Sequence, residues 1–382
     1  MSKNEIRIGI TGQSGFVGTH LFNVLGQFPD KYIRVPFEDD YFKKKSCLED
    51  FVNNCDVIIH LAAMNRHNDP QILFDTNVKL VKQIIEACKK TLSKPHIIFS
   101  SSIQEQSNNH YGRSKKEGRR LFELWAQTNN AHCSGLVIPN LFGPFGLPHY
   151  NSVVATFCHQ LTLGEVPQVA VDAEIGLLYI SELGSEIMAI IDKNQFNEDN
   201  SQTSVHMIRP TKTIRVSSLL AKLISFKESY YDQGFIPNLD NQFDLCLFNT
   251  FLCYIDKSDY FPFHLSRYSD SRGIFVETMK LKSGGQISFS TTNPGVTRGN
   301  HYHTRKAERF AVIRGKARIE MRRIGTEEKL SFILDGELPS FVDMPIWHTH
   351  NITNIGDDTL FTVFWINEHY NSEDTDTFFE EV

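Results

Sequence analysis

The segment Gly299–Gly315, GNHYHTRKAERFAVIRG, constrains the fold of this 382-residue chain more than any other. It places His301, His303 and Glu308 at H-x-H-x4-E spacing. Alternate residues of a β-strand share a face, so both histidines are predicted to point the same way, and Glu308 to return on the next strand after a polar turn. Further along, His350 offers a fourth side chain. Mixed imidazole and carboxylate ligands suit zinc, iron, nickel or manganese, so this spacing predicts a metal site among β-strands.

These two stretches resemble the two-part signature of the cupin β-barrel. The first part, G-x5-H-x-H-x4-E-x6-G, begins at Gly295, and the second, P-x-G-x2-H-x3-N, covers Pro345–Asn354. Trp347 stands where the pattern has glycine, a departure that removes no ligand. The alternative is that the histidines are ordinary core or surface residues. The ligands that the resemblance implies for one divalent ion, expected to be zinc, are His301, His303, Glu308 and His350.

Composition excludes several classes of function. The formal net charge of −6 and the pI near 6.2 provide no basic excess, so nucleic acid is not an expected partner. No apolar stretch reaches membrane length and no secretion signal is present, so membrane insertion is not expected either. The seven cysteines are scattered, without a C-x2-C pair. The sequence therefore predicts a cytoplasmic protein.

The N-terminal segment has the pattern of a dinucleotide-binding unit. A short apolar strand, Ile6–Ile10, leads into the turn Gly12–Gly18 and then into a helical pattern. Glycines permit a tight turn whose backbone N–H groups can meet a pyrophosphate at the helix N-terminus. A second strand, Tyr32–Phe37, is predicted to end at Glu38, whose carboxylate would accept the ribose hydroxyls of NAD.

A tyrosine and a lysine in the next part of the chain suggest proton transfer. The predicted strand Pro95–Ser100 opens into a serine triplet that ends at Ser102, and Tyr111 and Lys115 follow at the head of a predicted helix. Residues four apart share a helical face. A lysine ammonium stabilises phenolate and so lowers the pKa of a tyrosine, and a serine hydroxyl can hold the same carbonyl oxygen.

From about residue 5 to 255 the chain resembles the extended short-chain dehydrogenase/reductases, which implies an α/β Rossmann-type doubly wound parallel sheet and NADPH or NADH as cofactor. Two positions depart from the family: Val137 replaces a common Arg and Ser181 a usual Asp. On the substrate side the expected residues are Asn140, in the family's N-x-x-G-P turn, Asn151 and Ser152. The implied roles are pyrophosphate binding by Gly12, Gly15, Phe16 and Gly18, a border to the adenosine half by Leu61 and Ala62, and catalysis by Ser102, Tyr111 and Lys115, with Lys115 also on the cofactor.

From about residue 260 short alternating strands predict an all-β, jelly-roll domain. The octapeptide Asp270–Glu277, D-x-R-G-x-F-x-E, resembles the opening strand of nucleotide-sugar 3,5-epimerases, in which the arginine, here Arg272, handles the nucleotide diphosphate. The alternative is a simple turn salt bridge between Asp270 and Arg272. Those epimerases generally lack the metal cluster that this chain has.

One narrower family joins both halves: the bifunctional capsular-polysaccharide enzymes of the CapF type, which the chain resembles over nearly its whole length. This resemblance implies a reductase domain, residues 1–256, and a metal-binding cupin epimerase domain, residues 257–382. The implied reaction is C3 epimerisation of a UDP-2-acetamido-2,6-dideoxy-4-hexulose followed by reduction of its C4 ketone, with Tyr302 and Tyr268 as candidate proton carriers in the barrel. A homodimer is expected. The alternatives are a single-activity reductase or epimerase with a sugar-sensing cupin, and a non-enzymatic scaffold.

Overall fold

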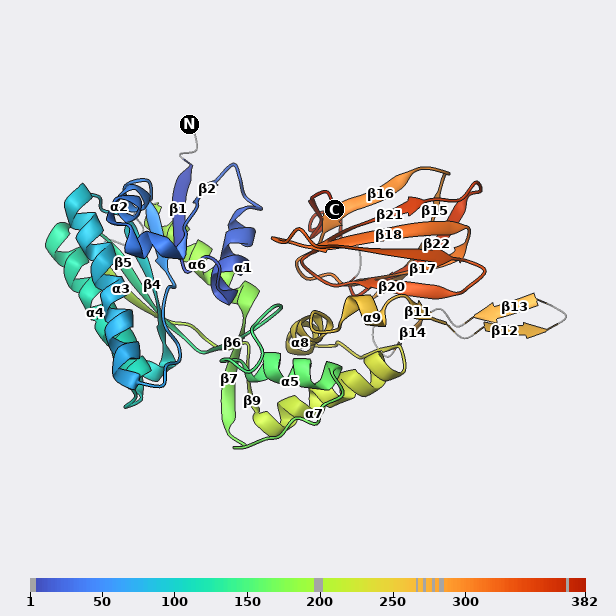
Figure 1. Ribbon diagram of the computed structural model, residues 1–382, viewed down its shortest axis with the longest axis horizontal. Helices are drawn as coiled ribbons and strands as arrows, with labels where there is room; N and C mark the ends of the chain where they lie inside the picture. The colour runs from blue at the N-terminus through green and yellow to red at the C-terminus, as the bar shows by residue number, and fades with distance from the viewer. Residues whose placement is uncertain are drawn as a thin grey trace. The chain divides into compact units, whose positions relative to one another are not determined.

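The computed structural model divides into two compact units (Figure 1). The first unit comprises Met1–Phe142 and Glu174–Ile214, and the second comprises Gly143–Ala173 and Arg215–Val382. The predicted domain boundary between residues 256 and 257 stays a prediction. The structure describes residues 5–195, 202–265, 267–270, 273–276, 279–281, 285–368 and 371–382.

The first unit is built on a six-stranded sheet in which every neighbouring pair of strands is parallel. Its interior strands are near-continuous apolar runs because helices cover both faces. The predicted doubly wound Rossmann-type sheet is thereby confirmed. In sheet order the strands are Tyr32–Val35 (β2), Ile6–Thr11 (β1), Val57–His60 (β3), His96–Ser102 (β4), Cys133–Ile138 (β5) and Thr203–Met207 (β8).

Helices α2, α3 and α4 share one apolar core with the sheet, while α1 packs against α6 on the other face (Figure 1). Asp69 caps α3 by accepting from Gln71 N at 2.8 Å, and Asn109 caps α4 by accepting from Gly112 N at 2.7 Å. The second cap sets where the helix carrying Tyr111 begins. The helices are Phe16–Leu25 (α1), Asp39–Lys43 (η1), Lys45–Asn53 (α2), Pro70–Thr91 (α3), Ile103–Gln106 (η2), His110–Asn129 (α4) and Ile180–Gln195 (α6).

The topology of this sheet places a crevice at the ends of β1 and β3. The chain leaves β1 for β2 on one side and returns to β3 on the other, so the crossover helices on the two sides diverge at the carboxyl ends of these two strands. A smaller sheet, in the order β6-β7-β9, is formed by Asn140–Phe142 (β6), Glu174–Tyr179 (β7) and Lys212–Arg215 (β9).

The second unit contains two five-stranded sheets whose neighbouring strands are antiparallel where registers are defined, packed over a shared apolar core. Within the described part of the chain no ladder joins these sheets, so the predicted barrel is present as two layers rather than as a closed ring of strands. The first sheet contains Phe263–His264 (β11), Ser340–Met344 (β20), Glu308–Arg314 (β17), Leu360–Ile366 (β22) and Gln286–Thr292 (β15). The second contains Lys329–Asp335 (β19), Lys316–Arg323 (β18), His348–Asn354 (β21), Thr297–Tyr302 (β16) and Phe378–Phe379 (β23).

Short elements complete the second unit. Two small sheets pair β10 with β14 and β12 with β13. These elements are Val153–Thr162 (α5), Val216–Phe226 (α7), Lys227–Asp232 (η3, a π-helix), Phe235–Ile236 (β10), Gln242–Leu252 (α8), Lys257–Tyr260 (α9), Arg267–Asp270 (β12), Gly273–Val276 (β13) and Lys280–Leu281 (β14).

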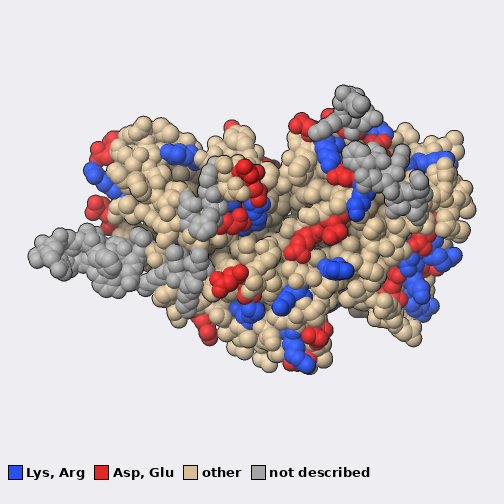
Figure 2. Space-filling model, turned by 180° about the vertical axis from the view of Figure 1, so that it is seen from behind, with Lys and Arg blue, Asp and Glu red and all other residues tan. Residues whose placement is uncertain are grey.

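The described surface carries charges of both signs. On the face drawn in Figure 2, basic and acidic side chains are interspersed among uncharged residues. None of the helices in the described ranges has both the length and the apolarity needed to cross a bilayer.

Candidate dinucleotide site and metal centre

The glycine turn after β1 has a conformation that only small residues fit. Gly12 has φ +71°, and a Cβ on it would lie 3.0 Å from the backbone of Ala62. A Cβ on Gly18 would lie 2.2 Å from the carbonyl oxygen of Gly12, so helix α1 packs directly on the turn. Thr11 holds the facing segment, because its backbone oxygen accepts from Leu61 N and its Oγ1 from Ala62 N, each at 3.3 Å. The predicted cofactor residues of β1 and β3 therefore meet in the crevice.

The helix that follows is open at its N-terminus. Gly15 is the N-cap and Phe16 the first residue of α1, and no side chain caps this end among the described residues. The N–H groups of the first helical turn are thus available to an anion such as a pyrophosphate.

The end of β2 differs from its prediction. The strand ends at Val35 rather than Phe37, and Glu38 is an exposed residue just before η1. Its neighbour Asp39 accepts a hydrogen bond from Ser14 Oγ, in the glycine turn, at 3.1 Å. Three carboxylates therefore follow β2, those of Glu38, Asp39 and Asp40, and Asp39 is the one tied to the turn. The run of acidic residues at this point is a signal that could have included Asp39 in the predicted site.

The structure brings Tyr111 and Lys115 together on the first turns of α4. The Lys115 side chain is 4% exposed, and its Nζ lies 5.7 Å from the centre of the Tyr111 ring. Nζ donates to the backbone oxygen of Ser100 at 2.8 Å. Burial lowers the pKa of Lys115 to about 8. The tyrosine hydroxyl thus has a cation nearby whose charge is held in a water-poor environment.

Ser102 is the last residue of β4 and precedes the segment on which α4 packs. Its Oγ accepts from Gln104 N at 3.2 Å. A Cβ on Gly112 would lie 1.9 Å from the backbone oxygen of Gln104, so the start of α4 sits directly against the turn after Ser102. This close approach keeps the predicted serine and tyrosine on neighbouring segments.

No sequence pattern indicated Asn77, a buried polar residue of α3 that supports this site. Its Oδ1 accepts from Met64 N at 2.7 Å, and its Nδ2 donates to Met64 O and to Ser114 Oγ, each at 3.0 Å. Asn77 thereby fastens the segment after β3 to the turn of α4 that carries Lys115. A lone asparagine in an amphipathic helix has no distinguishing spacing, so only the fold identifies it.

In the described part of the chain the predicted substrate residues are divided between the two units. Asn140 is exposed at the start of β6, in the first unit, where its Nδ2 donates to Gly176 O at 3.4 Å. Asn151 and Ser152 belong to the second unit, where Ser152 Oγ caps α5 by accepting from Ala155 N at 3.2 Å. Arg272 lies outside the described residues.

The second unit assembles the four predicted metal ligands. Their ligand atoms all lie within 4.8 Å of one another. His301 on β16 pairs with His350 on β21, and their ring centres are 4.8 Å apart. A bulge after Gly299 interrupts β16 just ahead of His301, and Glu308 begins β17. As predicted, His301 and His303 face the same way, with ring centres 5.0 Å apart.

Hydrogen bonds made by Nδ1 of His303 and His350 direct the lone pair on Nε2 of each ring toward Glu308. Nδ1 of His303 donates to the backbone oxygen of Asp376 at 2.5 Å, and Nδ1 of His350 donates to that of His348 at 3.1 Å. A carbonyl oxygen can only accept, so each neutral ring keeps its lone pair on Nε2. These two Nε2 atoms lie 3.3 Å and 3.0 Å from one oxygen of Glu308.

The charge states of the four predicted ligands favour binding of one cation between them. Burial lowers the pKa of His301 to about 4, so this ring is neutral at pH 7. Burial alone would raise the pKa of Glu308, but the adjacent His303 and His350 rings outweigh it and keep the pKa low. Burial also opposes charge on His303, whereas Glu308 favours it and raises the pKa of that ring. Lone pairs facing a carboxylate repel unless a proton or a metal ion lies between them, so these four residues fit a divalent cation.

The backbone conformation at Trp347 explains why the cupin pattern has glycine at this position. Its φ is +59°, a left-handed conformation that glycine adopts freely. Its N–H donates to the backbone oxygen of His303 at 2.8 Å, and its ring stacks on Tyr302 with centres 5.6 Å apart. The replacement of glycine by Trp347 therefore leaves the segment that carries His303 in place, and the contact between the two aromatic rings helps to hold it.

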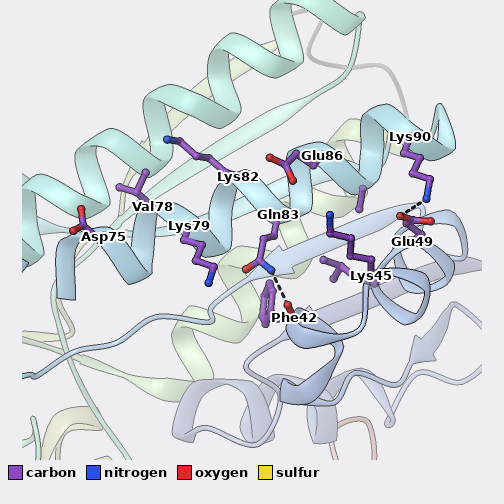
Figure 3. Close-up of a pocket in the computed structure, with 12 residues that line it drawn as sticks. Phe42, Lys45, Glu49, Asp75, Val78, Lys79, Lys82, Gln83, Glu86 and Lys90 are labelled. Atoms are coloured by element: carbon purple, nitrogen blue, oxygen red, sulfur yellow. Dashed lines mark hydrogen bonds and ion pairs between the residues drawn. The ribbon is translucent and has the colours of Figure 1, made fainter. Parts of the chain in front are cut away.

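A groove of about 570 Å³ lies between α2 and α3 in the first unit (Figure 3). Both lysines and carboxylates line it, and Lys90 pairs with Glu49 at 2.8 Å. It shares no residue with the predicted cofactor or catalytic sets, so it is separate from the dinucleotide crevice.

Comparison with known proteins agrees with the fold. Residues 8–202 match the NAD dependent epimerase/dehydratase family, and residues 268–378 match the polysaccharide biosynthesis C-terminal domain. The fold is also similar to that of WbmF from Bordetella bronchiseptica in complex with NAD+, at a TM-score of 0.55 and 15% identity, over 66% of this chain and 93% of that one. These matches define a nicotinamide-dependent enzyme of the epimerase/dehydratase class joined to a polysaccharide biosynthesis domain.

Two relatives match nearly the whole chain. A UDP-2-acetamido-2,6-beta-L-arabino-hexul-4-ose reductase of Pseudomonas aeruginosa is 32% identical over 98% of both chains. The crystal structure of the capsular polysaccharide assembling protein CapF from Staphylococcus aureus is similar at a TM-score of 0.62 and 31% identity, over 99% of this chain and 100% of that one. The chain belongs to the CapF-type family of capsular polysaccharide biosynthesis proteins.

Proposed function

We propose that the chain is a bifunctional UDP-sugar enzyme. C3 of a UDP-2-acetamido-2,6-dideoxy-4-hexulose is inverted in the second unit, where four side chains would hold a metal ion, and the Tyr111 site then reduces the C4 ketone with NADPH or NADH. The observation that carries the proposal is the convergence of three imidazoles and a buried carboxylate in the same chain as a Tyr–Lys pair. The substrate class rests on the name of the Pseudomonas aeruginosa relative.

The reductase half supplies protons and orientation. The nicotinamide cofactor, when bound, supplies the hydride that C4 receives. Tyr111 donates its hydroxyl proton to the C4 oxygen, and Ser102 holds that oxygen by a hydrogen bond. The Lys115 ammonium stabilises the phenolate that remains, because a cation favours the charged form of a neighbouring acid. Reduction removes the ketone that makes C3 acidic, so it ends the epimerisation.

The metal half needs a base and an acid on opposite faces of the sugar. A divalent ion held by His301, His303, Glu308 and His350, expected to be zinc, would polarise the C4 oxygen and so acidify the proton on C3. Tyr302 stays a candidate proton carrier, and its ring is held in place by stacking against Trp347 and Phe378. Tyr268 stays a candidate, since its side chain lies outside the described part.

The product of these two reactions is a UDP-6-deoxy-L-talosamine-type sugar, on the route to UDP-L-FucNAc for capsule or O-antigen. We further propose a cytoplasmic homodimer. Light scattering at micromolar concentration tests the dimer, and a monomer under those conditions contradicts it.

Two variants and two assays test the division of labour. Tyr111→Phe should abolish ketone reduction, followed by nicotinamide absorbance, and leave C3 deuterium uptake intact. His350→Gln should do the reverse when a ketone already inverted at C3 is supplied. Loss of both activities in a folded Tyr111→Phe protein contradicts the proposal. A native protein that binds the metal but shows no C3 exchange favours a sensing domain, and C3 exchange that survives both chelation and His350→Gln removes the metal from the mechanism.

A further inference from the structure

The last residues of the chain lie across the strand that carries His301, a predicted metal ligand. Strand β23 pairs with β16, where Phe379 is opposite His301 and Phe378 opposite Tyr302. The backbone N–H of Glu380 donates to Asn300 O at 3.0 Å. We call residues 371–382 the C-terminal strap. The strap therefore continues the sheet beside the metal centre.

One side chain of the strap holds the turn between two ligands. The carboxylate of Asp376 accepts from the backbone N–H groups of Thr304, Arg305 and Lys306 at 3.1, 3.0 and 3.1 Å, and from Thr304 Oγ1 at 2.6 Å. These residues form the turn that leads from His303 to Glu308. Asp376 is 5% exposed, so its carboxylate is satisfied by this turn rather than by water. The carboxylate thus fixes the separation of the two ligands.

The backbone of the same residue orients a ligand directly. The carbonyl oxygen of Asp376 accepts from Nδ1 of His303, which places the lone pair of Nε2 toward Glu308. Nε2 is buried and has no hydrogen-bond partner among the described groups. Asp376 has φ +44°, a left-handed conformation that aspartate, asparagine and glycine tolerate best. The position of the carbonyl therefore depends on a residue type that accepts this backbone geometry.

We propose that Asp376 is a positioning residue for the metal centre, and that docking of the C-terminal strap and binding of the divalent ion stabilise each other. The inference rests on the proposed metal site. Coupling between two events is reciprocal, so if the docked strap raises metal affinity, the bound metal must hold the strap in place by the same factor. Asp376 touches neither metal nor sugar in this proposal, and it acts through His303 and the turn.

The test uses three variants of the full-length chain. Asp376→Gly keeps the left-handed backbone accessible and removes the carboxylate, whereas Asp376→Asn keeps one acceptor oxygen. Asp374→Asn is the matched control, because Asp374 is a neighbouring strap residue whose carboxylate pairs at the surface with Arg305, at 2.7 Å. Zinc affinity is measured by competition with a chelator of known affinity. Hydrogen exchange of residues 371–382 is followed with and without zinc.

The expected result is zinc binding weakened about 10- to 100-fold in Asp376→Gly, less in Asp376→Asn and hardly at all in Asp374→Asn. Zinc should slow exchange of the strap in the native protein and do so far less in Asp376→Gly. Equal zinc affinity of the native protein and Asp376→Gly, or strap exchange that zinc leaves unchanged, overturns the proposed coupling. A native protein that binds no divalent ion overturns the metal site itself and the role of the strap with it. Nitrogen NMR of His303 adds a check on folded variants, since the proposal requires the proton on Nδ1 in the native protein.

Discussion

Replacing Trp347 separates two opposing contributions to the stability of the second unit. The side chain is 3% exposed and stacked on Tyr302, and truncation of such a buried tryptophan to alanine costs about 3–5 kcal/mol. Its left-handed backbone costs a non-glycine residue about 1–2 kcal/mol. Glycine releases that strain but loses about 0.5–1 kcal/mol more chain entropy on folding. Trp347→Gly should therefore be destabilised, yet remain about 0.5–1 kcal/mol more stable than Trp347→Ala.

Hydrogen exchange of strand β21 measures this difference in the presence of a chelator. It reports opening of the second unit, whereas denaturation of the whole chain would mix the transitions of both units. Exchange should be about two- to fivefold slower in Trp347→Gly than in Trp347→Ala. The neighbouring Ile346, which is fully buried and has no left-handed backbone, is the control. Without strain to release, Ile346→Ala should be more stable than Ile346→Gly and should exchange more slowly. Faster exchange in Trp347→Gly than in Trp347→Ala would refute the argument from backbone strain.

Three further predictions concern buried charge and cofactor choice. Reduction should slow as pH rises through about 8, because the buried Lys115 is charged below this pKa and neutral above it; a kcat/KM that is constant between about pH 7 and 10 contradicts this. The carboxylates of Glu38 and Asp39 should repel a 2′-phosphate, so NADH should be accepted at least as well as NADPH, and an NADPH preference of about a hundredfold in kcat/KM would count against their role. Arg309→Met should destabilise the second unit by about 3–5 kcal/mol, because it strands the carboxylate of Asp343, which Arg309 Nε contacts at 2.8 Å in the core. Adding Asp343→Leu should recover most of that loss in hydrogen exchange, and a double variant no more stable than Arg309→Met would contradict the ion-pair argument.

Local patterns were sufficient for much of the first unit. Glycines before a helix, apolar runs of strand length and Tyr-x3-Lys at helical spacing all concern residues close in sequence, and their geometry follows from backbone sterics and periodicity. The end of β2 was the exception. The apolar pattern continues to Phe37 although ladder pairing stops at Val35, because pairing depends on the neighbouring strand and not on the residues alone.

The sequence by itself determined that His301, His303 and Glu308 would come together as a cluster of possible metal ligands, because strand alternation and a short turn leave little freedom between them. Only the tertiary structure decided which groups orient those ligands. Asp376 reaches the turn after His303 from the far end of the chain, and Asn77 reaches Lys115's turn from another helix. Each belongs to a residue type that is common in loops and on helix surfaces, so neither has a spacing that marks it. Their roles arise when folding buries polar groups that must then find partners, and those partners are set by topology rather than by distance along the chain.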